Sequence, residues 1–188
     1  MDKRPLILLG ALAILSLLGF LFNQKQNVVV QKPPVQDNSP AVNITIQKGD
    51  FSITFPFYWQ EAGSMPGASY TAFNTRHKAA KDSTLGPTYA TISYDQKGDW
   101  EFSSYKSVVK GKLAASFEGL KFIQESKEKS NGGDIYFIEA QAGKQRLLIM
   151  LSGFTQGAVW EVVFVTTQDY WDQSREEFYT IARSFQPK

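Results

Sequence analysis

The chain has 188 residues, of which 43% are hydrophobic and 14% aromatic, a formal net charge of +2 at pH 7 and no cysteine. This length and apolar content are enough for one well-packed domain. The small net charge, without a concentrated basic segment, argues against a nucleic-acid partner, because a polyanion needs a basic face. Without cysteine there is no disulfide, no thiolate metal site and no cysteine-linked lipid anchor.

The N-terminal region contains an uncharged apolar segment, residues 5–22, preceded by Lys3 and Arg4. Its 18 residues are close to the roughly 20 that cross a bilayer, and the preceding positive charges favour a cytoplasmic N-terminus. A cleaved signal peptide is the alternative, but the segment ends in a bulky FLF sequence without a small-x-small cleavage site. We therefore predict that residues 1–22 form one N-terminal transmembrane helix, an uncleaved signal anchor. Both interpretations export the rest of the chain.

Residues 23–42 have a different character, with three prolines, many polar side chains and no sustained helical or alternating pattern. This composition predicts a flexible linker with a root-mean-square span of about 25 Å. The remaining residues, 43–188, are predicted to form a single globular domain.

The predicted domain begins with a β-hairpin. Residues 44–55 alternate between apolar and polar side chains on either side of a Lys-Gly-Asp turn, which is typical of two paired strands. Pro56 cannot donate a ladder hydrogen bond and is expected to end the second strand. The following aromatic segment is interpreted as a fold corner, in which Phe55 and Trp59 close the end of the core.

The later strands and helices are predicted from the spacing of apolar residues, which changes from every second residue to every third or fourth. Predicted strands cover residues 70–74, 89–94, 135–141, 146–154 and 159–167, and predicted amphipathic helices cover residues 102–120 and 170–185. The last three strands are apolar on both sides, which predicts a sheet covered on both faces. The charged segment 121–129 is expected to form a solvated hairpin or loop. This order predicts an α+β domain, an antiparallel sheet flanked by helices in an α/β/α sandwich.

Three segments together resemble the PsbP/Mog-type superfamily of α/β/α sandwich domains. They are FSITFPFYWQ at 51–60, GGDIYFIEA at 132–140 and IARSF at 181–185, and the resemblance extends over nearly all of residues 43–188. It implies a central antiparallel sheet with helices on both faces and, usually, a non-catalytic role. Known members include lumenal extrinsic proteins of photosystem II, a Ran-binding factor and exported bacterial proteins. A photosystem II association would require a photosynthetic host.

Residues suited to catalysis are few. His77 is the only histidine, so no histidine pair can hold a metal, and we expect it in an exposed loop. Asp82 and Ser83 lie near it in sequence, but no nucleophile elbow surrounds the serine. An exported hydrolase centred on His77 stays open as an alternative, as does a small-ligand-binding domain with a cavity between sheet and helix.

A hydrolase could instead use a pair of carboxylates as its catalytic residues. Asp95 and Asp99 lack the further oxygen ligands of a calcium loop and are interpreted as part of a turn. Glu176 and Glu177 are expected on the solvated face of the last helix, although two convergent carboxylates are what a glycosidase requires. We predict no catalytic residue, no metal site and no cofactor.

Aromatic side chains near the ends of elements are the candidates for a partner or ligand surface: Tyr58, Trp59, Trp100 and Trp171. Such residues are enriched in interfaces, but they also close the ends of cores. The leading hypothesis is a non-catalytic interaction or assembly module, anchored in the membrane and facing the periplasm, lumen or exterior. Its partner would be a protein or another envelope component.

Overall fold

The computed structural model describes residues 43–188, except 64, 78–87, 97–101, 131–132 and 153–157. The predicted transmembrane helix and linker, residues 1–42, lie outside the described residues and remain predictions. Within the described part, no helix is both long and apolar enough to cross a bilayer.

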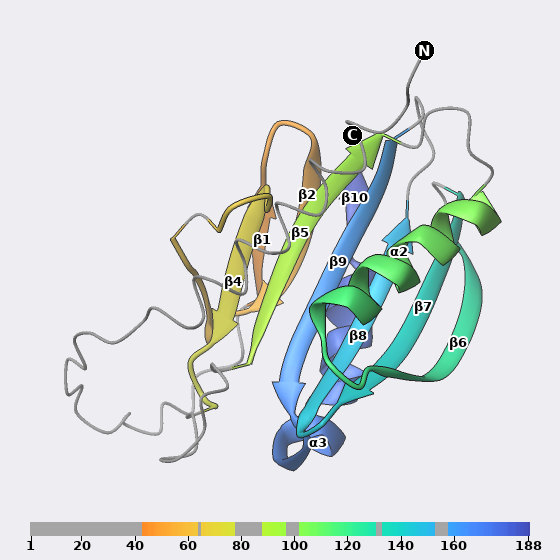
Figure 1. Cartoon of the computed structure of the whole chain (residues 1–188). Coiled ribbons are helices and arrows are strands. Elements are labelled where there is room, and N and C mark those ends of the chain that lie inside the picture. The colour runs from red at the N-terminus through yellow and green to blue at the C-terminus, as the bar shows by residue number, and fades with distance from the viewer. Residues whose placement is uncertain (1–42, 64, 78–87, 97–101, 131–132, 153–157) are drawn as a thin grey trace.

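A seven-stranded antiparallel sheet forms the centre of the domain (Figure 1). Its strands lie in the order β3-β4-β5-β9-β8-β7-β6. They are β3 (Trp59–Glu61), β4 (Tyr70–Asn74), β5 (Tyr89–Gln96), β6 (Lys121–Ser130), β7 (Gly133–Ala142), β8 (Gln145–Ser152) and β9 (Ala158–Thr167). Every predicted strand of the sheet is present. β3 is a strand that the sequence pattern did not indicate, and β6 lies in the charged segment that was predicted to be a hairpin or loop.

A second, three-stranded sheet is built from the two ends of the domain. The predicted hairpin is confirmed as β1 (Asn43–Gln47) and β2 (Phe51–Pro56), with Ile46 opposite Ile53. The C-terminal strand β10 (Gln186–Pro187) pairs with the other edge of β2. The end of the domain is therefore tied to its beginning.

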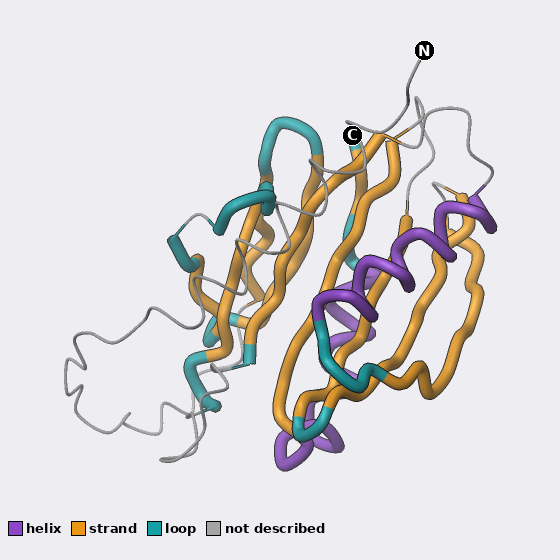
Figure 2. The backbone as a smooth tube through the Cα atoms, in the orientation of Figure 1, coloured by secondary structure: helices purple, strands orange, loops and turns teal. Residues whose placement is uncertain are grey.

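Two helices cover the central sheet on opposite faces, as Figures 1 and 2 show. They are α2 (Phe102–Ser116) and α3 (Gln168–Arg183). Along β9 the side chains alternate, so that Val162 and Phe164 join the core on the α3 side while Val159 and Val165 join the core on the α2 side. The predicted antiparallel sheet with a helix on each face is confirmed.

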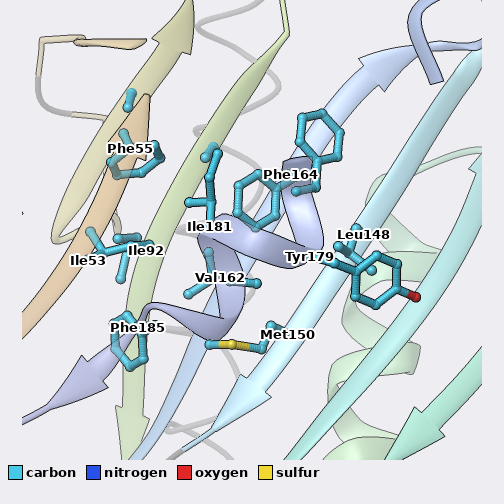
Figure 3. Close-up of a cluster of buried hydrophobic side chains, with 14 of the residues drawn as sticks. Ile53, Phe55, Ile92, Leu148, Met150, Val162, Phe164, Tyr179, Ile181 and Phe185 are labelled. Atoms are coloured by element: carbon cyan, nitrogen blue, oxygen red, sulfur yellow. The ribbon is translucent and has the colours of Figure 1, made fainter. Parts of the chain in front are cut away.

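The core on the α3 side is rich in aromatic side chains (Figure 3). Phe55 and Trp59 are 2% and 4% exposed, with ring centroids 5.3 Å apart. This confirms that the segment around Pro56 is a fold corner whose aromatics close the core. Phe164 and Phe178 stack with centroids 4.9 Å apart and attach α3 to the sheet.

The charged segment after α2 forms the edge strand β6 of a hairpin with β7. Most of its side chains face solvent, and a register shift between Phe122 and Gln124 leaves Ile123 52% exposed. The hairpin alternative of the prediction is therefore confirmed. A charged, irregular edge strand resists pairing with other chains, which explains why this strand lacks apolar alternation.

Candidate functional site

An open pocket of about 270 Å³ lies where β3 and β4 meet α3. We call it the Glu177 pocket. The residues that line it are Tyr58, Asn74, Arg76, His77, Tyr170, Gln173, Ser174 and Glu177. They come from three segments that are distant in sequence, and the β3–β4 pairing and the docking of α3 bring them together.

The Glu177 carboxylate is the centre of the pocket's hydrogen bonding. Trp59 Nε1 donates to Oε1 over 2.9 Å, Asn74 Nδ2 donates to the same oxygen over 3.4 Å, and the Tyr58 hydroxyl donates to Oε2. Trp59 and Asn74 are directly opposite each other in the β3–β4 register, so their side chains reach Glu177 from adjacent strands. Two donors from the sheet and one from the turn before β3 therefore hold one carboxylate of the helix.

Tyr58 remains a hydrogen-bond donor at neutral pH. Burial, together with the hydrogen bond to Glu177, raises the pKa of its hydroxyl well above the ordinary value. The neutral phenol therefore fixes the ring at the pocket mouth.

Arg76 covers the Tyr58 ring. We call Arg76, Tyr58 and the neighbouring Phe57 the Arg76 platform. The Arg76 guanidinium carbon lies 3.6 Å from the Tyr58 ring centroid and 5.4 Å from that of Phe57. Arg76 is exposed, and Phe57 is 40% exposed. No described carboxylate forms an ion pair with Arg76. The guanidinium therefore stacks on aromatic rings and keeps donors for a ligand.

The turn after β4 holds this arrangement in place. The backbone N–H of Arg76 donates to Asn74 Oδ1 over 2.9 Å, as in an Asx turn. Thr75 donates to the Tyr58 carbonyl oxygen both from its backbone N–H, over 3.0 Å, and from its hydroxyl, over 2.8 Å. The platform thus rests on a hydrogen-bonded turn.

His77 lies in the loop after β4, as predicted, but it is half-buried, so the expectation that it is exposed is wrong. Its ring stacks on Tyr170 with centroids 4.2 Å apart and planes 4° apart, and its Nδ1 lies 2.7 Å from the Thr88 hydroxyl oxygen. Burial lowers the pKa of His77, the nearby Glu177 opposes that shift, and the Arg76 charge adds to it. His77 is therefore a neutral, packed part of the pocket wall at pH 7.

Among the described residues, no hydrogen bond joins His77 to a serine or a carboxylate. His77 is hydrogen-bonded to Thr88, and Ser174 in the same pocket has a buried hydroxyl without a hydrogen-bond partner. Asp82 and Ser83 lie outside the described residues. In the described part, no group of three or more histidine, aspartate or glutamate residues could hold a metal.

Glu176 and Glu177 do not converge in the described structure. Glu176 is 77% exposed and pairs with Arg175, whereas Glu177 turns into the pocket, so the expectation that both lie on the solvated face is wrong for Glu177. Asp95 accepts hydrogen bonds from Lys112 and Tyr105, and Asp99 lies outside the described residues.

The four predicted surface aromatics have different environments. Tyr58 is half-buried at the pocket mouth. Trp59 and Trp171 are 4% and 3% exposed, and Trp171 lies beneath Arg146, whose guanidinium carbon is 4.4 Å from the ring centroid. Trp100 lies outside the described residues. A direct partner role for this set stays a prediction, and Tyr58 is the member placed to touch a ligand.

Sequence reasoning did not select Asn74, Arg76, Ser174 or Glu177 for this site. Asn74 carried a usable signal, because it is a polar residue in a predicted strand on the same face as Tyr70 and Ala72, and the structure shows it 2% exposed. Buried polar side chains need partners, so such a position points to a polar cluster. Glu177 carried no comparable signal.

Solved structures with a similar fold include two that match over most of their own length. The solution structure of cyanobacterial PsbP (CyanoP) from Synechocystis sp. PCC 6803 matches with a TM-score of 0.60 at 14% identity, over 82% of this chain and 98% of that chain. The domain has a PsbP-like fold. The crystal structure of LpqN, involved in cell envelope biogenesis of Mycobacterium tuberculosis, matches with a TM-score of 0.54 at 15% identity, over 78% of this chain and 91% of that one. No family model and no curated protein matches the sequence.

Proposed function

We propose that this chain is a non-catalytic interaction or assembly module, anchored in the membrane by residues 1–22, whose PsbP-like domain binds a protein partner outside the cytoplasm. The observation that carries the proposal is the Arg76 platform, an exposed arginine stacked on Tyr58 beside the exposed Phe57. Arginine and tyrosine dominate the binding energy of protein interfaces when they are held rigidly.

Two further features support a binding role. The platform needs little ordering on association, because Glu177 holds the Tyr58 hydroxyl and Thr75 holds the Tyr58 backbone carbonyl. Such pre-organisation raises affinity. LpqN, which has the same fold, is involved in cell envelope biogenesis, and a similar envelope setting suits a tethered domain. An association with photosystem II belongs to this proposal only for a photosynthetic host.

A photo-crosslinking experiment in the native membrane tests the partner site. A benzophenone amino acid replaces Phe57 in the full-length chain, and a matched control replaces Ile44, which is exposed to a similar extent at 43% against 40%. We expect one defined adduct from position 57 that weakens when Arg76→Ala is added. Equal adducts from both positions, or the uncrosslinked chain alone from position 57, would contradict the proposal.

The location of the domain is tested separately, using the absence of native cysteine. Single Lys144→Cys and Lys3→Cys variants are treated in intact cells with a membrane-impermeant maleimide. Lys144 is exposed at the β7–β8 turn and should react at once, whereas position 3 should react only after the cytoplasmic membrane is permeabilised. The opposite pattern would place the domain in the cytoplasm and contradict the proposed location outside it.

A further inference from the structure

A second concavity, separate from the Glu177 pocket, opens on the α2 face of the sheet. It has a volume of about 100 Å³ and lies over β5 and β9, between the C-terminal half of α2 and residues 66–68. We call it the Glu161 crevice. Its main apolar walls are Pro66, Ala68, Leu113, Phe117, Val163 and Val165. A single water needs roughly 15 Å³ by a comparable measure, so the crevice can accommodate a short alkyl chain.

The strand register places polar groups at the floor of this crevice. Ser93 is opposite Glu161 and Tyr89 is opposite Val165 in the β5–β9 pairing. Alternation along both strands therefore directs Tyr89, Ser93 and Glu161 to the α2 face. These residues line the crevice together with the apolar wall.

Two of these polar groups have no partner among the described residues. The Tyr89 hydroxyl is buried without a hydrogen bond, and the Tyr89 side chain is 8% exposed. The Glu161 carboxylate forms no hydrogen bond or ion pair with the part of the chain that the structure describes. Of the two, the Tyr89 hydroxyl is the buried, unsatisfied group, which is rare and costly, whereas the Glu161 side chain is partly exposed. The floor of the crevice therefore presents two polar groups that are free to meet a bound molecule.

The surrounding charges favour a cation. Lys112 of α2 is paired with Asp95, its Nζ donating to Oδ2 over 2.9 Å, and the Tyr105 hydroxyl donates to the same oxygen over 3.3 Å. Two carboxylates, Asp95 and Glu161, therefore face one ammonium, and the group carries one net negative charge when Glu161 is ionised.

We propose that the Glu161 crevice binds a small primary alkylammonium ion. The ammonium donates to the Glu161 carboxylate, and the alkyl chain packs against Leu113 and Phe117. This assignment gives Glu161 a partner, matches the charge and uses the apolar walls.

The site should respond to pH. Burial raises the pKa of Glu161 to about 7, with Lys112 opposing and Asp95 reinforcing the shift. A primary ammonium stays protonated to about pH 10, so binding follows the ionisation of Glu161. Between pH 6 and pH 8 the ionised fraction of a group with this pKa rises about tenfold, and affinity should rise by the same factor.

A ligand titration of the full-length protein tests the proposal. The chain, with methyl-labelled leucine and valine, is placed in zwitterionic nanodiscs, and the Leu113 and Val163 methyl resonances are followed by NMR. Three four-carbon probes are compared: n-butylammonium, n-butanol and butyrate. We expect saturable shifts with n-butylammonium, weaker binding of n-butanol and none with butyrate. Glu161→Gln should weaken n-butylammonium binding by about tenfold or more at pH 8 and abolish its pH dependence.

Glu118→Gln is the matched control, because Glu118 carries the same charge just beyond α2 and is exposed outside the crevice. It should leave affinity unchanged. Equal binding of n-butylammonium and n-butanol, equal affinities of the wild type and Glu161→Gln, or no saturable shift at Leu113 and Val163 would each overturn the proposal.

Discussion

The Glu139 carboxylate of β7 lies 2.7 Å from the Arg175 guanidinium of α3, although only 4% of the Glu139 side chain is exposed. The Tyr179 hydroxyl, also from α3, donates to the same carboxylate oxygen over 2.8 Å. These bonds fix both the axial position and the rotation of α3 on the sheet. Ser174 and Glu177 lie on the same helix, so this buried cluster also sets the geometry of the Glu177 pocket.

Loss of the Glu139 carboxylate should destabilise the domain strongly. Glu139→Leu leaves the Arg175 and Tyr179 donors without their acceptor, and we expect the free energy of unfolding to fall by about 3 kcal/mol. Urea unfolding of the full-length protein in detergent, followed by tryptophan fluorescence, measures this change. Glu176→Gln is the control, because Glu176 contacts the same arginine but is 77% exposed, and it should change stability by less than about 0.5 kcal/mol. Equal effects would contradict the assignment.

Glu177 should act as the acceptor that orders the Arg76 platform. Glu177→Leu leaves the Trp59 indole N–H without its 2.9 Å partner, which should lower the free energy of unfolding by about 1–3 kcal/mol. Glu177→Gln keeps one acceptor oxygen and should lose less. The Trp59 indole N–H resonance is the second readout, and it should move in Glu177→Leu but stay close to its position in Glu177→Gln. Identical spectra for the two variants would refute this role.

His77 should make stability fall in mild acid. Its pKa is lowered in the folded state, mainly by burial, so the folded protein binds the proton more weakly than the unfolded chain does. This contribution to stability is complete above about pH 6.5, the unfolded pKa, and is lost as pH falls through the folded pKa. The difference in unfolding free energy between wild type and His77→Gln should therefore shrink on acidification. A difference in unfolding free energy that does not change with pH would contradict this role of His77.

The contribution of Glu161 to stability should have the opposite pH dependence. Its folded pKa of about 7 is higher than the ordinary 4.5, so the folded state favours the protonated carboxyl, and this stabilisation disappears as pH rises through about 7. Glu161→Gln should therefore match the wild type near pH 4 and be more stable by about 3 kcal/mol at pH 8. Urea unfolding at the two pH values measures this. A variant less stable than the wild type at pH 8 would contradict it.

Much of the fold could be predicted because burial imposes a period on the sequence. The alternation across 44–55 predicted the hairpin, and the four-residue spacing within 102–120 predicted a helix. The observed helix ends earlier than predicted, at Ser116, and is followed by Gly119, whose φ of +68° suits glycine. The β6 edge strand escaped prediction, because an exposed, charged edge needs no apolar alternation.

The candidate site was harder to predict for a related reason. Periodicity identifies which faces are buried, but it does not show which polar side chains meet. Glu177 occupies a polar position next to the buried stripe of α3, and its donors Trp59 and Asn74 lie more than 100 residues away. The aromatic surface prediction included Tyr58 but could not identify Arg76, because their stacking depends on the turn after β4.

The most direct test of the central claim is the affinity of the full-length protein for the partner captured through position 57, measured with wild type and with Arg76→Ala. Truncating a stacked interface arginine should weaken binding by about 30-fold or more, and Arg76→Lys should restore only part of it, since lysine lacks the planar guanidinium. Arg183→Ala is the control: this exposed arginine lies 5.1 Å from the Tyr179 ring centroid, outside the Glu177 pocket, and its removal should leave affinity unchanged. Equal affinities of the wild type and Arg76→Ala would contradict the account.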